Sequence, residues 1–110
     1  MNINCHCQNI CIDVDTPAQL TQCNCSICRR YQALWAYYTP EDVHITVGSA
    51  GEAFYCWGDK EIEFVRCAQC GCVTHYRSLS SPRIAVNFNM LENALISEIP
   101  IRHFDGKTRL

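Results

Sequence analysis

The sequence predicts a mainly β, zinc-bound single domain of short antiparallel strands with one or two helical turns. Seven of the ten cysteines fall into three tight clusters with the spacing of metal ligands. Runs rich in β-branched and aromatic residues recur roughly every ten residues, which is typical of all-β domains. With 48% hydrophobic residues and no Gly/Pro-rich stretch or charge run, residues 1–110 are expected to form one globular domain.

The strand pattern is clearest near the start and in the aromatic region. Residues 10–15 alternate apolar and polar side chains toward their end. Trp35 and Tyr37 would share one face of their strand, where we expect core residues rather than a pocket wall. The predicted strands are residues 10–15, 34–38, 44–47, 53–57, 61–65, 73–76, 84–88 and 99–104.

Helical signals are few. Ser26 is expected to cap a short turn that runs from Cys28 to Tyr31. Pro40 opens a single helical turn that ends at Val43. Glycine, proline and serine predict chain turns at residues 48–51, at Gly58-Asp59 and at residues 80–82.

The strongest metal signal is Cys67-Ala68-Gln69-Cys70-Gly71, which has the form of a zinc knuckle. Two thiolates flank a tight turn, and a glycine follows where the chain reverses. Cys5 and Cys7 can complete a tetrahedron if the N-terminal segment lies beside this turn; in a plain strand both would instead belong to the core. We expect this four-cysteine cluster (Cys5, Cys7, Cys67 and Cys70) to hold a closed, structural zinc that the fold requires.

A three-cysteine cluster (Cys23, Cys25 and Cys28) lies on a loop that enters a helical turn. Three sulfurs can cap one face of a second zinc ion and leave a position for water or an external thiolate. Such an open site is a candidate catalytic centre, and its ion would be the more labile of the two. The alternative is a second structural zinc closed by one of five residues: His6, Cys11, Cys56, Cys72 or His75.

Other polar residues are candidates for ligand contacts. Arg29 and Arg30 follow the three-cysteine cluster and could bind the carboxylates of a ligand, or they could be solvated charges that balance the thiolates. Asn87 could orient a ligand or bond a neighbouring backbone group. His75 could act as an acid or base near neutral pH.

Charge and hydropathy limit the partners and the compartment. The formal net charge is −2, so there is no basic face for nucleic acid. No apolar run approaches the roughly 18 residues of a membrane span, and the start lacks an export signal. We therefore expect a cytoplasmic protein, in a reducing compartment where clustered cysteines bind metal rather than pair as disulfides.

The order of the cysteine motifs closely resembles that of the glutathione-dependent formaldehyde-activating enzymes, whose domain is shared with centromere protein V. One departure is Gln8-Asn9, which stands where members of the family have a glycine-containing turn. The resemblance covers nearly the whole chain, through Cys5-His6-Cys7, Cys23-Asn24-Cys25-Ser26-Ile27-Cys28-Arg29-Arg30, Trp35, Arg66-Cys67-Ala68-Gln69-Cys70-Gly71, Val86-Asn87-Phe88-Asn89-Met90-Leu91 and Ile101-Arg102-His103-Phe104-Asp105.

The resemblance implies a structural zinc at the four-cysteine cluster and a second zinc at the three-cysteine cluster as the active site. The implied activity is that of a carbon–sulfur lyase, which joins formaldehyde and glutathione into S-hydroxymethylglutathione. The expected partners are thus a glutathione-like thiol and a small aldehyde. The alternative function is a zinc-stabilised binding or adaptor module without turnover, and an exchangeable fourth position on the second zinc distinguishes the two.

Overall fold

A computed structural model describes residues 1–57, 61–91 and 93–109. Within them, short strands dominate and every helix is a single turn, so the mainly β fold class is confirmed. The predicted turn at Gly58-Asp59 lies outside the described residues. None of the described helices is long and apolar enough to cross a membrane.

The strands are β1 (Asn2–Asn4), β2 (Ile10–Asp13), β3 (Leu20–Cys23), β4 (Trp35–Tyr38), β5 (His44–Val47), β6 (Glu52–Trp57), β7 (Ile62–Cys67), β8 (Val73–Ser78), β9 (Ile84–Asn87) and β10 (Ile101–Phe104). The helical turns are α1 (Cys28–Tyr31), η1 (Pro40–Asp42), η2 (Phe88–Met90), α2 (Asn93–Ile96) and α3 (Gly106–Arg109).

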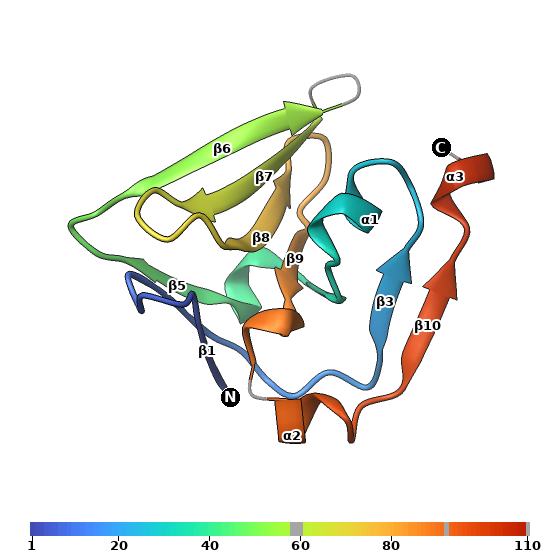
Figure 1. The fold of residues 1–110 in the computed structure, drawn as a ribbon, viewed down its shortest axis with the longest axis horizontal. Coiled ribbons are helices and arrows are strands. Elements are labelled where there is room, and N and C mark those ends of the chain that lie inside the picture. The colour runs from blue at the N-terminus through green and yellow to red at the C-terminus, as the bar shows by residue number, and fades with distance from the viewer. Residues whose placement is uncertain (58–60, 92, 110) are drawn as a thin grey trace.

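The strands form two sheets. The larger sheet has the order β10-β3-β4-β9-β8-β7-β6, and the smaller has the order β1-β2-β5. Neighbours are antiparallel except β3 and β10, which run parallel with Leu20 opposite Ile101. Figure 1 shows this parallel pair side by side, at the opposite end of the molecule from β6.

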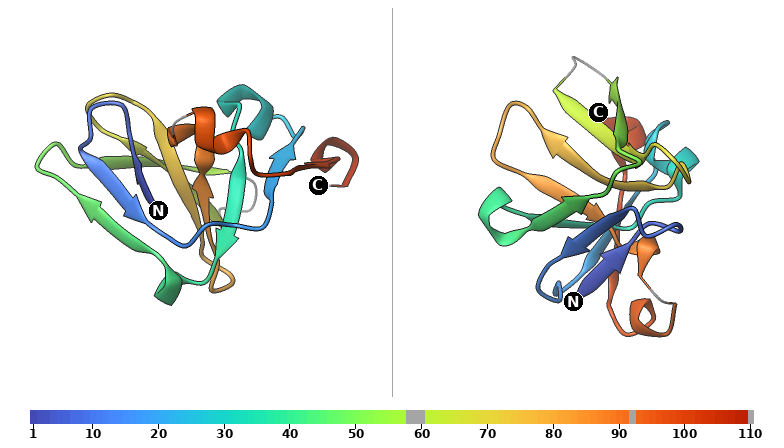
Figure 2. Two further views of the ribbon diagram at one scale, coloured as in Figure 1. Left: turned by 90° about the horizontal axis from the view of Figure 1, so that it is seen from below. Right: turned by 90° about the vertical axis from the view of Figure 1, so that its left-hand side faces the viewer.

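The main core lies between the two sheets. Side chains alternate across a strand, and along β4 this places Ala36 toward the core and Trp35 toward the other face. Ile10, Ile12 and Phe88 in this core are almost fully buried, and each contributes about 1.5–3 kcal/mol of burial. The views in Figure 2 show the smaller sheet against one face of the larger sheet. The three-cysteine cluster lies on the opposite face of the larger sheet.

The structure differs from the sequence expectations in the strand inventory, in the number of helical turns and at one helix cap. One or two helical turns were expected, whereas the described residues contain five. The strands β1 and β3 were not predicted, because each has three or four residues and a polar composition. Ser26 does not cap α1: the cap residue is Ile27, without a side-chain bond. Instead, the Cys25 Sγ accepts the N–H of Cys28 at 3.5 Å, so a sulfur takes the place of the expected hydroxyl.

Candidate metal centres

The four-cysteine cluster brings its sulfur atoms within 4.8 Å of one another. The Sγ of Cys7 lies 3.8 Å from that of Cys5 and 3.5 Å from that of Cys67. Sulfurs at the corners of a tetrahedron around zinc, each about 2.3 Å from the metal, would be about 3.8 Å apart. The donor set therefore fits one closed zinc site.

Two turns position these sulfurs. After β7, Gly71 adopts a φ of 81°, which favours glycine, and the backbone N–H groups of Gln69 and Cys70 donate to the Cys67 Sγ. After β1, the N–H of Ile10 donates to the Cys5 Sγ at 3.3 Å. Backbone donors of this kind stabilise thiolates, and they lower the pKa of Cys67. The cluster connects the smaller sheet to the larger one.

Asn9 is a supporting residue that the sequence analysis missed. Its Nδ2 donates to the Cys67 Sγ at 3.5 Å and to the carbonyl of Gly51 at 2.9 Å, while its Oδ1 accepts the N–H of Ala50. The preceding Gln8 adopts the left-handed φ of 66°. The turn without glycine thus still forms, and the amide of Asn9 fixes it to the knuckle.

The three-cysteine cluster lies on the other face of the larger sheet. Cys23 ends β3, Cys28 begins α1, and all three sulfurs lie within 4.8 Å of one another in buried positions. The indole Nε1 of Trp35 donates to the Cys28 Sγ at 3.4 Å. In the described part of the chain, no ligand atom of a fourth Cys, His, Asp or Glu joins the group. The donor set can therefore cap one face of a metal ion.

The three thiols differ in acidity. Burial raises the pKa of Cys23 and, more strongly, that of Cys28. Cys25 is buried too, but hydrogen bonds from the backbone of Cys28 and Ile27 and from the neighbouring thiols bring its pKa below the usual value. Of the three, Cys25 is thus the thiol whose pKa is lowered.

None of the five residues considered as a fourth ligand joins this cluster. Cys72 lies near the four-cysteine cluster, where burial and the charges of Cys70 and Cys5 raise its pKa. Cys11 donates to the carbonyl of Gln8. His6 follows Cys5, and Cys56 lies on β6.

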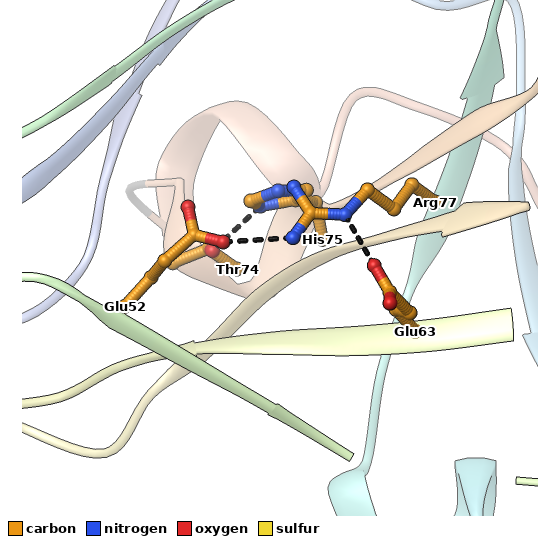
Figure 3. Close-up of polar contacts among 5 residues, drawn as sticks. All are labelled: Glu52, Glu63, Thr74, His75 and Arg77. Carbon is orange, nitrogen blue, oxygen red and sulfur yellow. Dashed lines mark hydrogen bonds and ion pairs between the residues drawn. The ribbon is translucent and has the colours of Figure 1, made fainter. Parts of the chain in front are cut away.

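His75 is buried on β8, on the face that its neighbour Arg77 shares. Its Nδ1 is 2.8 Å from the Thr74 hydroxyl, and its Nε2 has no hydrogen-bond partner among the described residues. Burial, followed by the charge of Arg77, lowers the His75 pKa to about 4. Figure 3 shows the ring beside Arg77, whose guanidinium donates to Glu52 and Glu63. We therefore assign His75 to the buried face of β8 beside Arg77, and not to the cysteine site.

Two cavities adjoin the three-cysteine cluster. A polar pocket of about 350 Å³ is lined by Gln22, Asn24, Arg29, His103 and Asp105, among others. An aromatic pocket of about 260 Å³ is lined by six rings, those of Trp35, Tyr37, Trp57, Phe64, Tyr76 and Phe104. Cys23, Cys28 and Phe104 line both pockets. These residues therefore lie at the boundary between the two cavities.

The aromatic pocket was not predicted. Trp35 and Tyr37 share one face of β4, as expected: Trp35 is fully buried in the second core cluster and Tyr37 packs against that cluster, and both also line the pocket. Rings from β7 and β8 join them because Phe64 and Tyr76 are opposite each other in the register of those strands. Strand alternation in the sequence could have predicted which rings share a face of the sheet. It could not have predicted that this face lies next to the three-cysteine cluster.

The other three predicted ligand-contact residues have different surroundings. Arg29 lines the polar pocket. Arg30 donates from Nη1 to the carbonyl of Ser26 at 2.6 Å, which holds it within its own loop. Asn87 uses its Oδ1 to accept from the N–H of Leu34 and its Nδ2 to donate to Val73 at 2.8 Å. Asn87 thus bonds neighbouring backbone groups.

Comparisons with known proteins agree with this arrangement. The family model described as "Glutathione-dependent formaldehyde-activating enzyme" matches residues 1–102. A crystal structure of a Rhodobacter sphaeroides protein, a structural genomics target, is similar with a TM-score of 0.75 and 29% identity. The match covers 93% of this chain and 100% of that one. A comparison with curated proteins gave no match.

Proposed function

Since the chain belongs to the family of glutathione-dependent formaldehyde-activating enzymes, we propose that it is a zinc-dependent carbon–sulfur lyase. It would join a glutathione-like thiol to a small aldehyde, or release the aldehyde from the adduct. The observation that carries this proposal is the buried three-cysteine cluster, which gains no fourth ligand from the described residues and whose Cys23 and Cys28 line the polar pocket. A closed structural site would have four ligands.

The two clusters would hold two zinc ions with different roles. The four-cysteine cluster would hold a structural ion, because its four sulfurs lie within 4.8 Å of one another and connect the two sheets. Cys23, Cys25 and Cys28 would hold the second ion. When bound there, zinc would supply a position for an external thiol and favour its deprotonated form.

The residues around the three-cysteine cluster would bind and orient the reactants. Arg29 in the polar pocket can pair with a carboxylate of the thiol. The indole N–H of Trp35 would hold Cys28 in place and offset part of the thiolate charge. In the addition, the thiol loses its proton to water, its sulfur bonds to the aldehyde carbon as the carbonyl π bond opens, and the resulting alkoxide oxygen takes a proton from water. The reaction needs no redox partner, and proximity is the main contribution.

We also propose that the protein works in the cytoplasm, without nucleic-acid or membrane partners. All ten cysteines are free thiols in the structure, which suits a reducing compartment. The net charge of −2 gives phosphate backbones no attractive surface.

The test compares the rate of adduct exchange with and without the protein. Exchange NMR on ¹³C-formaldehyde and glutathione gives the rate of formation and release of the adduct. We expect acceleration by the zinc-loaded protein and none by the Cys25→Ser variant, while Cys11→Ser, outside both clusters, retains the full effect. A wild-type rate equal to that of buffer would refute the lyase proposal.

One observation favours the alternative function, a binding module without turnover. The edge strand β6 exposes Phe54 and Tyr55, which are 51% and 49% accessible. Exposed aromatic side chains on an unpaired edge can add a strand from a partner. The same exchange experiment decides between the two functions, since only the lyase accelerates it.

A further inference from the structure

The aromatic pocket has features that formaldehyde does not use. Its rings pack against one another in fixed geometry: the centroid of Tyr76 is 4.9 Å from that of Trp35 and 5.4 Å from that of Phe64, both edge to face. Such contacts stabilise the arrangement beyond simple burial. The wall of the pocket is therefore preorganised.

The size of this pocket indicates a larger ligand. An apolar cavity of about 150 Å³ accommodates benzene, whereas a water molecule occupies about 30 Å³ of liquid. Formaldehyde has two heavy atoms and is close to water in size. The cavity of about 260 Å³ has room for an aromatic ring and a substituent.

The charge at the pocket points to an anionic substituent. Arg83 and Arg102 line it, and neither forms an ion pair with a carboxylate in the described part of the chain. The guanidinium of Arg83 stacks 4.2 Å from the ring centroid of Tyr37, which holds it at the wall. Among the described lining residues, none is an aspartate or glutamate.

Cys23 and Cys28 line both pockets, so ligands in the two pockets would meet beside the three-cysteine cluster. The polar pocket, with Arg29 and His103, suits the peptide-like body of a thiol. The aromatic pocket then remains for the substituent on the carbonyl carbon. Each reactant would have its own cavity, and the new carbon–sulfur bond would form between them.

We propose that the preferred carbonyl partner is an aryl-substituted aldehyde with a carboxylate, bound in the aromatic pocket with Arg83 at the carboxylate. This inference rests on the proposed lyase function. The thiol adds to the aldehyde carbon to give a hemithioacetal, with a proton delivered to the oxygen, and the reverse step releases both. Trp57, Ile62 and Arg83 would set the specificity.

The kinetic experiment measures kcat/KM with glutathione and three aldehydes: formaldehyde, phenylacetaldehyde and 4-(2-oxoethyl)benzoate, its ring-carboxylate analogue. We expect the wild-type protein to prefer the carboxylate. Arg83→Gln should lower the preference for the carboxylate over phenylacetaldehyde about tenfold, the effect of one charge-assisted contact. Ile62→Trp, which fills the pocket, and Trp57→Ala, which removes one wall, should each lower kcat/KM for both aryl aldehydes relative to formaldehyde. Arg66→Gln, an exposed arginine of β7 outside both pockets, is the matched control.

A binding measurement separates this inference from the lyase proposal. Both tryptophans of the chain line the aromatic pocket, so their fluorescence reports its occupancy. 4-Methylbenzoate, which keeps the ring carboxylate but has no aldehyde and cannot react, should change the fluorescence of the wild-type protein and lose affinity in Arg83→Gln. Acceleration with formaldehyde but no preference for aryl aldehydes would overturn the inference and leave the lyase function intact. Binding of 4-methylbenzoate without acceleration for any aldehyde would refute the lyase function, and with it the assignment of the ligand as a substrate.

Discussion

The indole Nε1 of Trp35 lies 3.4 Å from the Sγ of Cys28, although one residue is on a sheet strand and the other begins a helical turn. Both side chains are almost completely buried. A hydrogen bond from a neutral donor to a thiolate contributes about 1.5–3 kcal/mol, because one partner is charged. Through this hydrogen bond, a residue that lines the aromatic pocket also stabilises a sulfur of the proposed metal site.

We predict that Trp35→Phe weakens zinc binding at the three-cysteine cluster. The variant keeps a ring in the wall but removes the donor, and the loss of such a supporting bond typically costs about 10–100-fold in metal affinity. Competition with a chromophoric chelator measures the affinity. Trp57→Phe, which changes the other tryptophan of the aromatic pocket, is the control. Unchanged affinity in Trp35→Phe would show that the indole is only a packing element.

We predict opposite outcomes for one serine substitution in each cysteine cluster. Cys67→Ser removes a ligand that also accepts N–H bonds from Gln69 and Cys70, and it breaks the connection between the two sheets. We expect the domain to unfold at room temperature, because structural zinc contributes on the order of 10 kcal/mol. Cys25→Ser should remain folded and lose one zinc per chain.

Circular dichroism and elemental analysis of both variants measure these outcomes. Zinc content should fall from two ions to one in Cys25→Ser, and reduced glutathione should no longer shift its melting temperature. Equal unfolding of the two variants would contradict the division into a structural and a reactive centre.

Acid should destabilise the protein through His75. Its pKa lies at about 4 in the folded state and near its usual value of about 6.5 when unfolded, so the unfolded state takes up a proton first as the pH falls. The contribution of neutral His75 to the free energy of unfolding is fully present above its unfolded-state pKa, and it is lost as the pH falls from 6.5 to 4. From pH 7 to pH 5 the loss should be about 2 kcal/mol.

Denaturant unfolding of the wild type and of His75→Gln at pH 7 and pH 5 measures the contribution of His75 to the pH dependence of stability. The variant keeps both metal clusters, so effects of zinc release cancel in the comparison. Glu52 and Arg77 face the ring and remain in place. Equal pH dependence in the two proteins would exclude His75 as the source.

Removal of the Arg77 guanidinium should leave two carboxylates without a partner. Arg77 donates from Nε to Glu63 at 2.7 Å and from Nη2 to Glu52 at 2.8 Å, as Figure 3 shows. The side chains of Glu63 and Glu52 are 16% and 27% accessible, so solvent screens them only in part. We expect Arg77→Met to lower the free energy of unfolding by about 2 kcal/mol.

A double-mutant cycle with Glu63→Gln isolates the paired interaction. The second substitution should cost less in the Arg77→Met background than in the wild type, because one unpaired charge is already present. Additive losses would mean that the ion pair itself contributes nothing.

The sequence was sufficient for features that depend on local spacing. The knuckle at Cys67 and Cys70 follows from a turn that offers backbone N–H groups to sulfur, and the structure has that turn. Strand positions also followed from alternation, with small shifts at the ends. Features that depend on contacts between distant segments could not be predicted. The pairing of Leu20 with Ile101 joins segments some 80 residues apart, and no local signal specifies it.

The aromatic pocket was missed for the same reason. Trp35, Phe64 and Tyr76 come from three strands, and only the sheet order places them on the face of the cysteines. The failed cap at Ser26 has a local cause: the Cys25 sulfur competes for the same N–H group. The helix-capping preference for Ser, Thr, Asp and Asn is based on oxygen acceptors, so it does not predict that a cysteine sulfur accepts this hydrogen bond.

The parallel pairing of β10 with β3 also determines when the two cavities beside the cysteines can be completed during synthesis. Cys23, Cys25 and Cys28 leave the ribosome well before Phe104, which borders both cavities and follows Cys28 by 76 residues. The nascent chain therefore exposes three reactive thiols beside an incomplete cavity until β10 docks. Long-range pairing of this kind is slow to form. During that interval the thiols are open to cellular metal carriers and oxidants alike, and closure by Phe104 ends it.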